Sequence, residues 1–303
     1  MSYRSLTFWM FLAMIAWGST WVSAKILMEG MGAHQLIFWR FLLSAMGLIP
    51  VIWLMGHSWK IDRQALLIAL LAGLGLILYN RFFFLGTHLG EAGLGGVLVT
   101  TLNPILTFMF IALLSRKLLR QDEWFALILG ALGTLTILKV WNYGLEMWQQ
   151  PGILYFIAAA ATWPWITILS ARFKKGSPLV LSFYMFLITA LGDWALFLDF
   201  QIPALSALHP IEWLNLLSLS LYGTTFGTSI YFLAASRWGG AKASGYFFLV
   251  PFSAALFAAL FLHEEIGLST VIGGLFTLLA VYQINGYNLL GLSQRIQGWL
   301  QRS

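Results

Sequence analysis

Almost the whole chain consists of long apolar runs, and this feature limits what it can fold into. Runs of about 17 to 25 apolar residues are long enough to cross a hydrocarbon core of roughly 30 Å as helices. Ten such windows follow one another, at 6–24, 35–55, 65–85, 92–114, 124–141, 151–170, 178–198, 212–234, 243–262 and 268–287. Only 9% of the residues are charged, whereas a soluble domain has roughly 25%. The sequence therefore predicts an all-α protein with ten transmembrane helices, surrounded by a lipid bilayer.

The lysines and arginines predict how the chain lies in the membrane. Thirteen of the 17 fall at the N-terminus, in alternate loops or near the C-terminus, namely Arg4, Lys60, Arg63, Arg116, Lys117, Arg120, Arg172, Lys174, Lys175, Arg237, Lys242, Arg295 and Arg302. The opposite side carries only Lys25 and Lys139. Cytoplasmic loops are enriched in Lys and Arg, so both termini are expected in the cytoplasm. The net charge of +6 follows from these loops and does not predict a nucleic-acid partner.

Residue patterns of known enzymes are missing from the sequence. There is no cysteine, which excludes disulfides and thiolate metal sites. The five histidines lie in loops or at the ends of apolar windows, without metal-ligand spacing. No G-x-x-x-x-G-K-[ST] phosphate-binding loop occurs. We therefore expect a chain that is not an enzyme, with no cofactor, no metal and no use of ATP.

The second half of the chain repeats the first. The stretch Trp238–Glu265 matches Glu91–Lys117 when Pro251 is aligned with Pro104, and the opening WGSTWVSAK matches WPWITILSAR. Small residues also recur at matched places in the fifth and tenth windows, which predicts close packing of these two helices. Five spans per half is an odd number, so the second copy must enter from the opposite side. The sequence predicts two inverted five-helix repeats, residues 1–145 and 146–303, an architecture of many secondary transporters.

Several motifs in this order resemble the EamA family of the drug/metabolite transporter superfamily. They are W-G-S-x-W at Trp17–Trp21, the pair Arg40–Phe41, and L-x-P followed by an Ala/Leu/Phe run in each fourth helix. The resemblance covers nearly the whole chain. It implies an inner-membrane transporter that exports amino acids or related metabolites, with a central cavity lined by helices 1, 3, 4, 6, 8 and 9. One departure concerns the acidic residue after the proline-containing helix. It is present as Glu264 and Glu265, but the first half has Arg116 and Lys117 there.

Polar and indole side chains at mid-depth are the candidates for binding a small-molecule substrate. In hydrocarbon their polar atoms need partners, and for a single threonine a bond to neighbouring backbone is the simpler interpretation. Trp17 and Trp163 occupy matched, deep positions, so membrane-interface belts do not explain them. The candidate set is Trp17, Thr20, Trp21, Asn80, Arg81, Thr101, Asn103, Trp163, Thr167, Tyr222, Thr225 and Tyr231.

Two arginines, Arg40 and Arg81, lie inside apolar windows. Such charges are functional candidates, yet a long side chain near a helix end also reaches the headgroups by snorkelling. Snorkelling is the simpler interpretation for Arg40. For Arg81 the alternatives of substrate binding and anchoring stay equal, and Glu91 is a candidate partner in sequence.

Other functions remain open at this stage. The first helix has no acidic residue, so proton coupling through such a glutamate is unsupported. Import or exchange is the alternative to export. An intramembrane enzyme or a membrane scaffold is a third interpretation, and a scaffold would not need a polar cavity at mid-depth. Substrate, coupling ion and oligomeric state do not follow from the sequence.

Overall fold

A computed structural model describes residues 2–89, 92–142, 144, 149–205, 208–262 and 265–286. Most of these residues are helical, and none of them is in a strand. In chain order the segments are α1 (Tyr3–Gly30), α2 (Ala33–Leu54), α3 (Arg63–Leu89), α4 (Ala92–Ser115), α5 (Gln121–Ile137), the 3₁₀ turn η1 (Val140–Asn142), α6 (Gly152–Arg172), α7 (Pro178–Phe197), α8 (Pro210–Leu217), the π-helix η3 (Ser218–Thr228), α9 (Ser229–Trp238), α10 (Gly240–Gly245), the 3₁₀ segment η4 (Tyr246–Leu249), α11 (Val250–Leu262) and α12 (Leu268–Ile284).

The predicted membrane spans are confirmed in part. Seven segments of the described chain are long and apolar enough to cross a membrane: Tyr3–Gly30, Ala33–Leu54, Arg63–Leu89, Leu98–Ser115, Gly152–Arg172, Pro178–Phe197 and Gly240–Phe261. The other three windows differ from the prediction. Helices α5 and α12 have 17 residues each, and the window 212–234 is divided among α8, η3 and α9. The fold is therefore an all-α membrane protein, with seven candidate spans among the described residues by length and composition.

Sequence signals set several of the helix ends. The backbone N–H of His209 donates to Glu212 Oε2 at 2.7 Å, and Pro210 fills the first position of α8. The backbone N–H of Arg120 donates likewise to Glu123 Oε2 at 2.7 Å at the start of α5. A glutamate three residues after the cap satisfies a donor that the helix leaves unpaired. Both helices therefore begin where the sequence supplies this glutamate.

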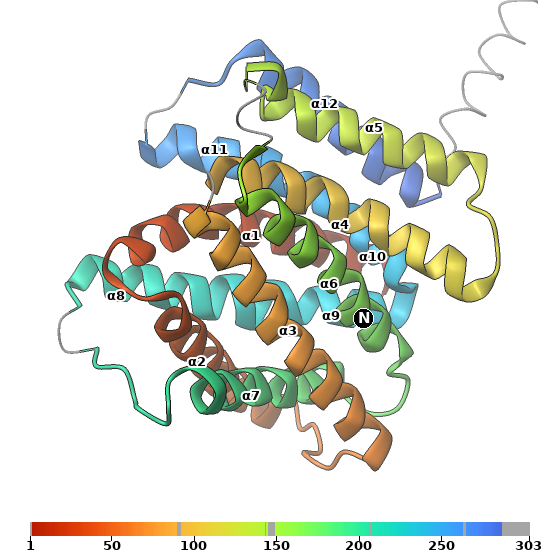
Figure 1. Cartoon of the computed structure of the whole chain (residues 1–303). Coiled ribbons are helices and arrows are strands. Elements are labelled where there is room, and N and C mark those ends of the chain that lie inside the picture. The colour runs from red at the N-terminus through yellow and green to blue at the C-terminus, as the bar shows by residue number, and fades with distance from the viewer. Residues whose placement is uncertain are drawn as a thin grey trace, which may run out of the picture.

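The helices form a bundle in which counterparts from the two halves pack on each other (Figure 1). Helix α5 lies along α12 at one edge, and α2 packs on α7 at the opposite edge. A Cβ atom at Gly273 would stand 2.5 Å from the Gly133 carbonyl oxygen, so only small residues allow this approach of α5 and α12. The predicted close packing of these two helices is confirmed. The predicted boundary between the halves, at residues 145 and 146, lies outside the described residues.

Large apolar side chains cover the outside of the bundle. Leu113, Leu154 and Leu268 are each about three-quarters exposed, and similar residues occur on most of the described helices. Water-soluble proteins rarely expose contiguous apolar patches beyond a few hundred Å². This surface fits the bilayer that the composition predicts.

Candidate functional site

A chamber lies between the halves of the chain, at the centre of the bundle. Its volume is about 120 Å³. Its walls comprise Trp17, Thr20, Trp21 and Ala24 of α1, Arg40 of α2, Tyr79, Asn80, Phe83 and Phe84 of α3, Val99 and Thr100 of α4, Trp163 of α6, Leu219 and Thr228 of η3, Phe247 of η4 and Val250 of α11. The six predicted segments all contribute, and α2 adds Arg40. The chamber is thus a mainly apolar space, rich in aromatic rings and with a few polar groups, as small-molecule sites commonly are.

Four aromatic rings close one side of the chamber, and we call them the aromatic floor: Trp17, Trp163, Tyr231 and Phe247. Every pair among them is in contact, with ring centroids between 4.8 Å (Trp17–Phe247) and 5.7 Å (Trp163–Tyr231). The four side chains are at most 8% exposed. Aromatic pairs at such separations add stability beyond the area they bury, so the floor is a tightly packed barrier.

The polar tips of these rings all have partners. Trp17 Nε1 donates to the Gly223 carbonyl oxygen at 3.0 Å and to Thr228 Oγ1 at 3.3 Å. Trp163 Nε1 donates to the Tyr231 hydroxyl at 3.3 Å, and this hydroxyl lies 2.8 Å from Thr167 Oγ1. The bonds of Trp17 join α1 of the first half to η3 of the second half, whereas the bonds of Trp163 and Tyr231 stay within the second half. The floor is therefore fixed in position by hydrogen bonds as well as by packing.

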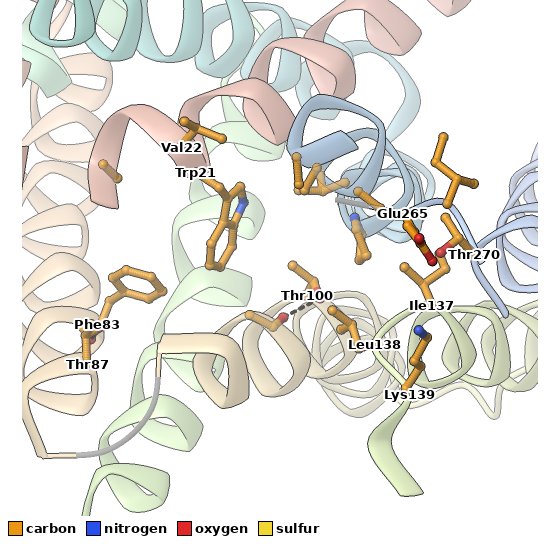
Figure 2. A pocket seen from close by; sticks show the side chains of 18 of the residues that line it. Trp21, Val22, Phe83, Thr87, Thr100, Ile137, Leu138, Lys139, Glu265 and Thr270 are labelled. Atoms are coloured by element: carbon orange, nitrogen blue, oxygen red, sulfur yellow. Dashed lines mark hydrogen bonds between the residues drawn. The ribbon is translucent and has the colours of Figure 1, made fainter. Parts of the chain in front are cut away.

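A wider cavity, which we call the vestibule, opens on the other side of the chamber. Its volume is about 580 Å³, and it shares Trp21, Ala24, Phe83, Thr100 and Val250 with the chamber. Figure 2 shows Trp21 and Phe83 on one side of the vestibule and Lys139 and Glu265 on the other. Through the shared residues, the vestibule leads from the end of the bundle that bears Lys139 and Glu265 into the chamber.

Small residues keep the vestibule open. Gly96 of α4 and Ala254, Ala255 and Ala258 of α11 form part of its wall. Directly before α11, η4 contributes Phe247 to the floor, and the backbone changes from a 3₁₀ to an α-helix just ahead of Pro251. Proline has no N–H to donate and disrupts regular helical bonding. The ninth predicted span thus closes the chamber with its first part and opens the vestibule with its second.

The Arg40 side chain points inward instead of reaching the headgroups. Its Nε donates to Thr224 Oγ1 of η3 at 2.8 Å, and its guanidinium carbon lies 5.3 Å from the Phe41 ring centroid. A polar seam next to it joins α2 to η3, because Ser44 Oγ donates to the Ser220 carbonyl oxygen at 2.9 Å and Thr225 Oγ1 donates to the Ser44 carbonyl oxygen at 3.0 Å. The snorkelling interpretation of Arg40 is therefore wrong, because its side chain bonds η3 and lines the chamber inside the bundle.

The segment η3 is wound as a π-helix over 11 residues. Thr224 Oγ1 bonds the Leu219 carbonyl oxygen at 3.1 Å, five residues back. A Cβ atom at Gly223 would stand 2.6 Å from Thr20 Cγ2 of α1, so this glycine allows α1 to approach η3. Extended π-helical stretches are rare and often occur at functional sites. Here the π-helix presents Leu219 and Thr228 to the chamber.

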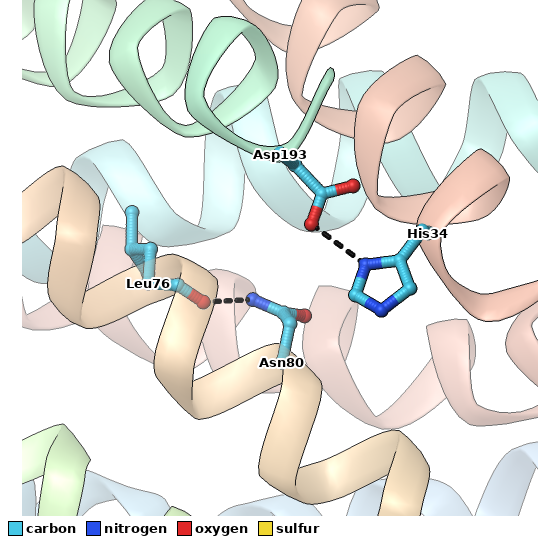
Figure 3. Close-up of polar contacts among 4 residues, drawn as sticks. All are labelled: His34, Leu76, Asn80 and Asp193. Atoms are coloured by element: carbon cyan, nitrogen blue, oxygen red, sulfur yellow. Dashed lines mark hydrogen bonds and ion pairs between the residues drawn. The ribbon is translucent and has the colours of Figure 1, made fainter. Parts of the chain in front are cut away.

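The second intramembrane arginine has different surroundings. Arg81 lines neither the chamber nor the vestibule, and its guanidinium carbon lies 4.3 Å from the Phe197 ring centroid. Nearby, His34 Nδ1 lies 2.9 Å from Oδ1 of the fully buried Asp193 (Figure 3). The Asp193 carboxylate also interacts electrostatically with Arg81. Arg81 thus lies beside a buried carboxylate, at the junction of α2, α3 and α7. Glu91, the partner considered from the sequence, lies outside the described residues.

The structure gathers part of the predicted substrate set around the chamber. Trp17, Thr20, Trp21, Asn80 and Trp163 line it, and Thr167 and Tyr231 lie directly behind Trp163. The others are elsewhere. Thr101 and Asn103 are buried inside α4 without lining either cavity, Thr225 bonds α2, and Tyr222 is 40% exposed and stacks on Phe226. Whether any of these residues binds substrate stays a prediction.

Most of the other lining residues were not among the candidates, and they include Arg40, Tyr79, Phe83 and Phe247. Tyr79 and Phe83 are four positions apart, with stacked rings whose centroids are 6.3 Å apart. This spacing, together with Asn80, marks one face of α3, and helical periodicity favours such a face. Phe247 lies among three neighbouring aromatic and aliphatic residues in η4, so no residue pattern distinguishes it from them.

Comparison with known proteins identifies the class. The model of the EamA-like transporter family matches residues 4–139 and again 150–286. The chain therefore belongs to the EamA-like transporter family, within the drug/metabolite transporter superfamily, and carries the family unit twice. The predicted resemblance is confirmed. Membership indicates an integral membrane transporter, which is coherent with the expectation that the chain is not an enzyme.

Individual relatives agree with this class. The uncharacterized transporter sll0355 of Synechocystis sp. is 24% identical over 94% of this chain and 92% of its own length. The uncharacterized transporter YoaV of Bacillus subtilis is 25% identical over 86% of this chain and 90% of its own length. A chloroplastic WAT1-related protein of Arabidopsis thaliana is 22% identical over 89% of this chain and 66% of its own length. One crystal structure shares the fold, with a TM-score of 0.76, 19% identity and coverage of 93% of this chain and 96% of that one.

Proposed function

We propose that the chain is a secondary transporter of small organic metabolites that works by alternating access. The observation that supports it is the chamber, which is lined by both halves, continuous with a vestibule at one end and closed by the aromatic floor at the other. Secondary transporters built from inverted repeats hold substrate between the repeats, near the middle of the membrane. In a transport cycle the floor would open as the vestibule closes.

The proposal includes ten spans in two inverted halves. Helices α5 and α12, with 17 residues each, extend about 26 Å at 1.5 Å per residue. This length is near the lower limit for a span. The run from α8 through η3 to α9 covers residues 210–238 without a break in helical backbone, and forms the eighth span despite its π-helical middle.

The excess of Lys and Arg, 13 against two, supports cytoplasmic termini in a bacterial-type inner membrane. The vestibule opens at the end with Lys139, which is then the outer side. In this arrangement the chamber faces outward and the aromatic floor separates it from the cytoplasm.

Export of amino acids or related compounds is the preferred direction and substrate class, and it rests on the family alone. Import or exchange is the alternative. The polar groups of the chamber, among them Arg40, Asn80 and Thr100, favour a transporter over a scaffold, because buried polar groups without a role are costly in a membrane. An intramembrane enzyme has no support from the described residues that line the chamber, because these include no histidine and no carboxylate.

The test is flux in proteoliposomes. Purified protein is reconstituted without ATP, and uptake and counterflow of a metabolite panel are measured with and without a pH gradient. The proposal predicts saturable, ATP-independent flux of at least one compound. A strict requirement for ATP, or no flux above that of empty liposomes for the whole panel, would contradict it. The pH gradient identifies or excludes proton coupling.

A further inference from the structure

Arg40 is the only charged side chain among the described residues that line the chamber. Its neighbours there are aromatic, aliphatic or neutral polar groups, so the chamber has a positive charge and no negative one. A charge inside a membrane protein is normally paired, or it contributes to a binding site or pathway. The question is therefore what balances Arg40.

No carboxylate in the described part of the chain pairs with Arg40. The ion pairs found there are His34–Asp193 and Arg120–Asp122, and Asp193 interacts with His34 and Arg81. Arg40 uses only Nε, which donates to Thr224 Oγ1 at 2.8 Å. Its two terminal nitrogens, Nη1 and Nη2, have no hydrogen-bond acceptor within the described residues. They are the donors of the planar fork with which arginine binds a carboxylate through two bonds.

The backbone around Arg40 is held in place before any ligand binds. Ser44 Oγ contacts the carbonyl oxygens of Arg40 at 2.6 Å and of Ser220 at 2.9 Å. The bond from Nε to Thr224 fixes the side chain itself against η3. A fixed donor loses little conformational freedom when it binds a ligand, so this arrangement suits recognition.

This inference rests on the proposed function. We propose that Arg40 binds a carboxylate group of the transported molecule. The substrates are then organic acids or zwitterions, and amines without an acid group are not transported. The apolar part of the substrate then lies against the rings of Trp17, Tyr79 and Trp163. Asn80 and Thr100 offer polar atoms for a second group such as an ammonium. The positive charge of Arg40 favours substrates with an acid group, because the described lining residues supply no negative partner for a cation.

The test compares ligands that differ only in the carboxylate. The thermal stability of the purified protein in detergent is measured against neutral amino acids, their amides and the matching deaminated acids. For each compound the wild type is compared with Arg40→Gln, Arg40→Met and Arg40→Lys. Arg81→Gln is the matched control, because it removes an intramembrane charge that lies outside both cavities. Arg40→Met keeps a long unbranched side chain without the charge, and it covers the case in which Arg40→Gln does not fold.

We expect the Tm of wild type and of Arg81→Gln to rise with amino acids or deaminated acids and not with the amides. Arg40→Gln and Arg40→Met should respond to none of the compounds, and Arg40→Lys should respond more weakly than wild type. The proposal is overturned if amides stabilise as strongly as acids, if no acid raises the Tm, if the neutral Arg40 variants keep the wild-type response, or if the Arg81 variant loses it equally.

The same ligands in proteoliposomes separate this inference from the proposed function. Stabilisation by acids that depends on Arg40, without flux of any compound, would contradict transport and support the carboxylate site. Flux of simple amines at the rate of the acids would support transport and overturn the carboxylate site.

Discussion

The two sides of the chamber differ in the size of their side chains, although one stretch of chain contributes to both. The floor takes Phe247 from η4, whose four residues are all buried, and the vestibule takes Ala254, Ala255 and Ala258 from α11. Dispersion between close-packed rings stabilises the closed side, whereas alanines leave a cavity of about 580 Å³ on the open side. Side-chain volume along this span therefore determines which side of the chamber is open.

The largest effect is expected from filling the vestibule. Ala258→Trp places an indole in its wall, so transport should be nearly abolished while the protein still folds, because the cavity has room for the new ring. Leu260→Trp is the matched control, since Leu260 is 69% exposed on the outer surface of the same helix. The measurement compares the flux and the folded yield of the two variants. Normal flux in Ala258→Trp would show that substrate does not pass through the vestibule.

A second large effect is expected at the floor. Trp163 contacts Trp17, Tyr79, Tyr231, Phe232 and Phe247, so Trp163→Ala should cost about 3–5 kcal/mol of stability, as for other buried aromatic truncations. The measurement is thermal stability together with flux per folded molecule.

Trp21→Ala is the informative comparison for Trp163→Ala. Trp21 is only partly buried and lines both cavities, so its truncation should reduce flux and leave the stability near that of wild type. The proposed distinction between floor and vestibule fails if the two variants show the same loss of stability.

A smaller effect is expected from Trp17→Phe. The ring stays in the floor, but the donor to the Gly223 carbonyl oxygen and to Thr228 Oγ1 is lost. The loss of one buried hydrogen bond should lower the free energy of unfolding by about 1–3 kcal/mol. Thermal unfolding of the purified variant measures this change. A stability equal to that of wild type would indicate that packing alone holds Trp17 in place.

The residues of the aromatic floor were easier to predict from the sequence than the residues around it. Trp17 and Trp163 occupy matched positions in the repeat, and in the structure their ring centroids are 5.6 Å apart. The close packing of α5 on α12 also followed from the repeated small residues. Both features depend on residue type and spacing along a regular helix, which a sequence displays directly.

Other features depend on helix rotation and on distant partners, which the sequence does not display. Arg40 and Arg81 look alike as charges near the ends of apolar windows, yet one faces the chamber and the other lies on Phe197 beside Asp193. Tyr222 was placed in the substrate set by its depth, but it lies within the π-helix η3 and is exposed. A π-helix has more residues per turn than an α-helix, so a face derived from α-helical periodicity is shifted there.

The proposed transport path depends on a chamber that opens through the vestibule and is closed by the aromatic floor. The chain has no cysteine, so single cysteines can be introduced without a background. Thr20→Cys reports on the chamber, because Thr20 lines the chamber and not the vestibule. Thr87→Cys reports on the vestibule and Ser58→Cys on the opposite end, where Ser58 lies between α2 and α3. The measurement is the labelling rate with a membrane-impermeant thiol reagent applied separately to each side of sealed vesicles. We predict that Thr20→Cys reacts fastest from the side that labels Thr87→Cys. Faster reaction from the side that labels Ser58→Cys, or no reaction from either side, would show that the chamber does not open through the vestibule.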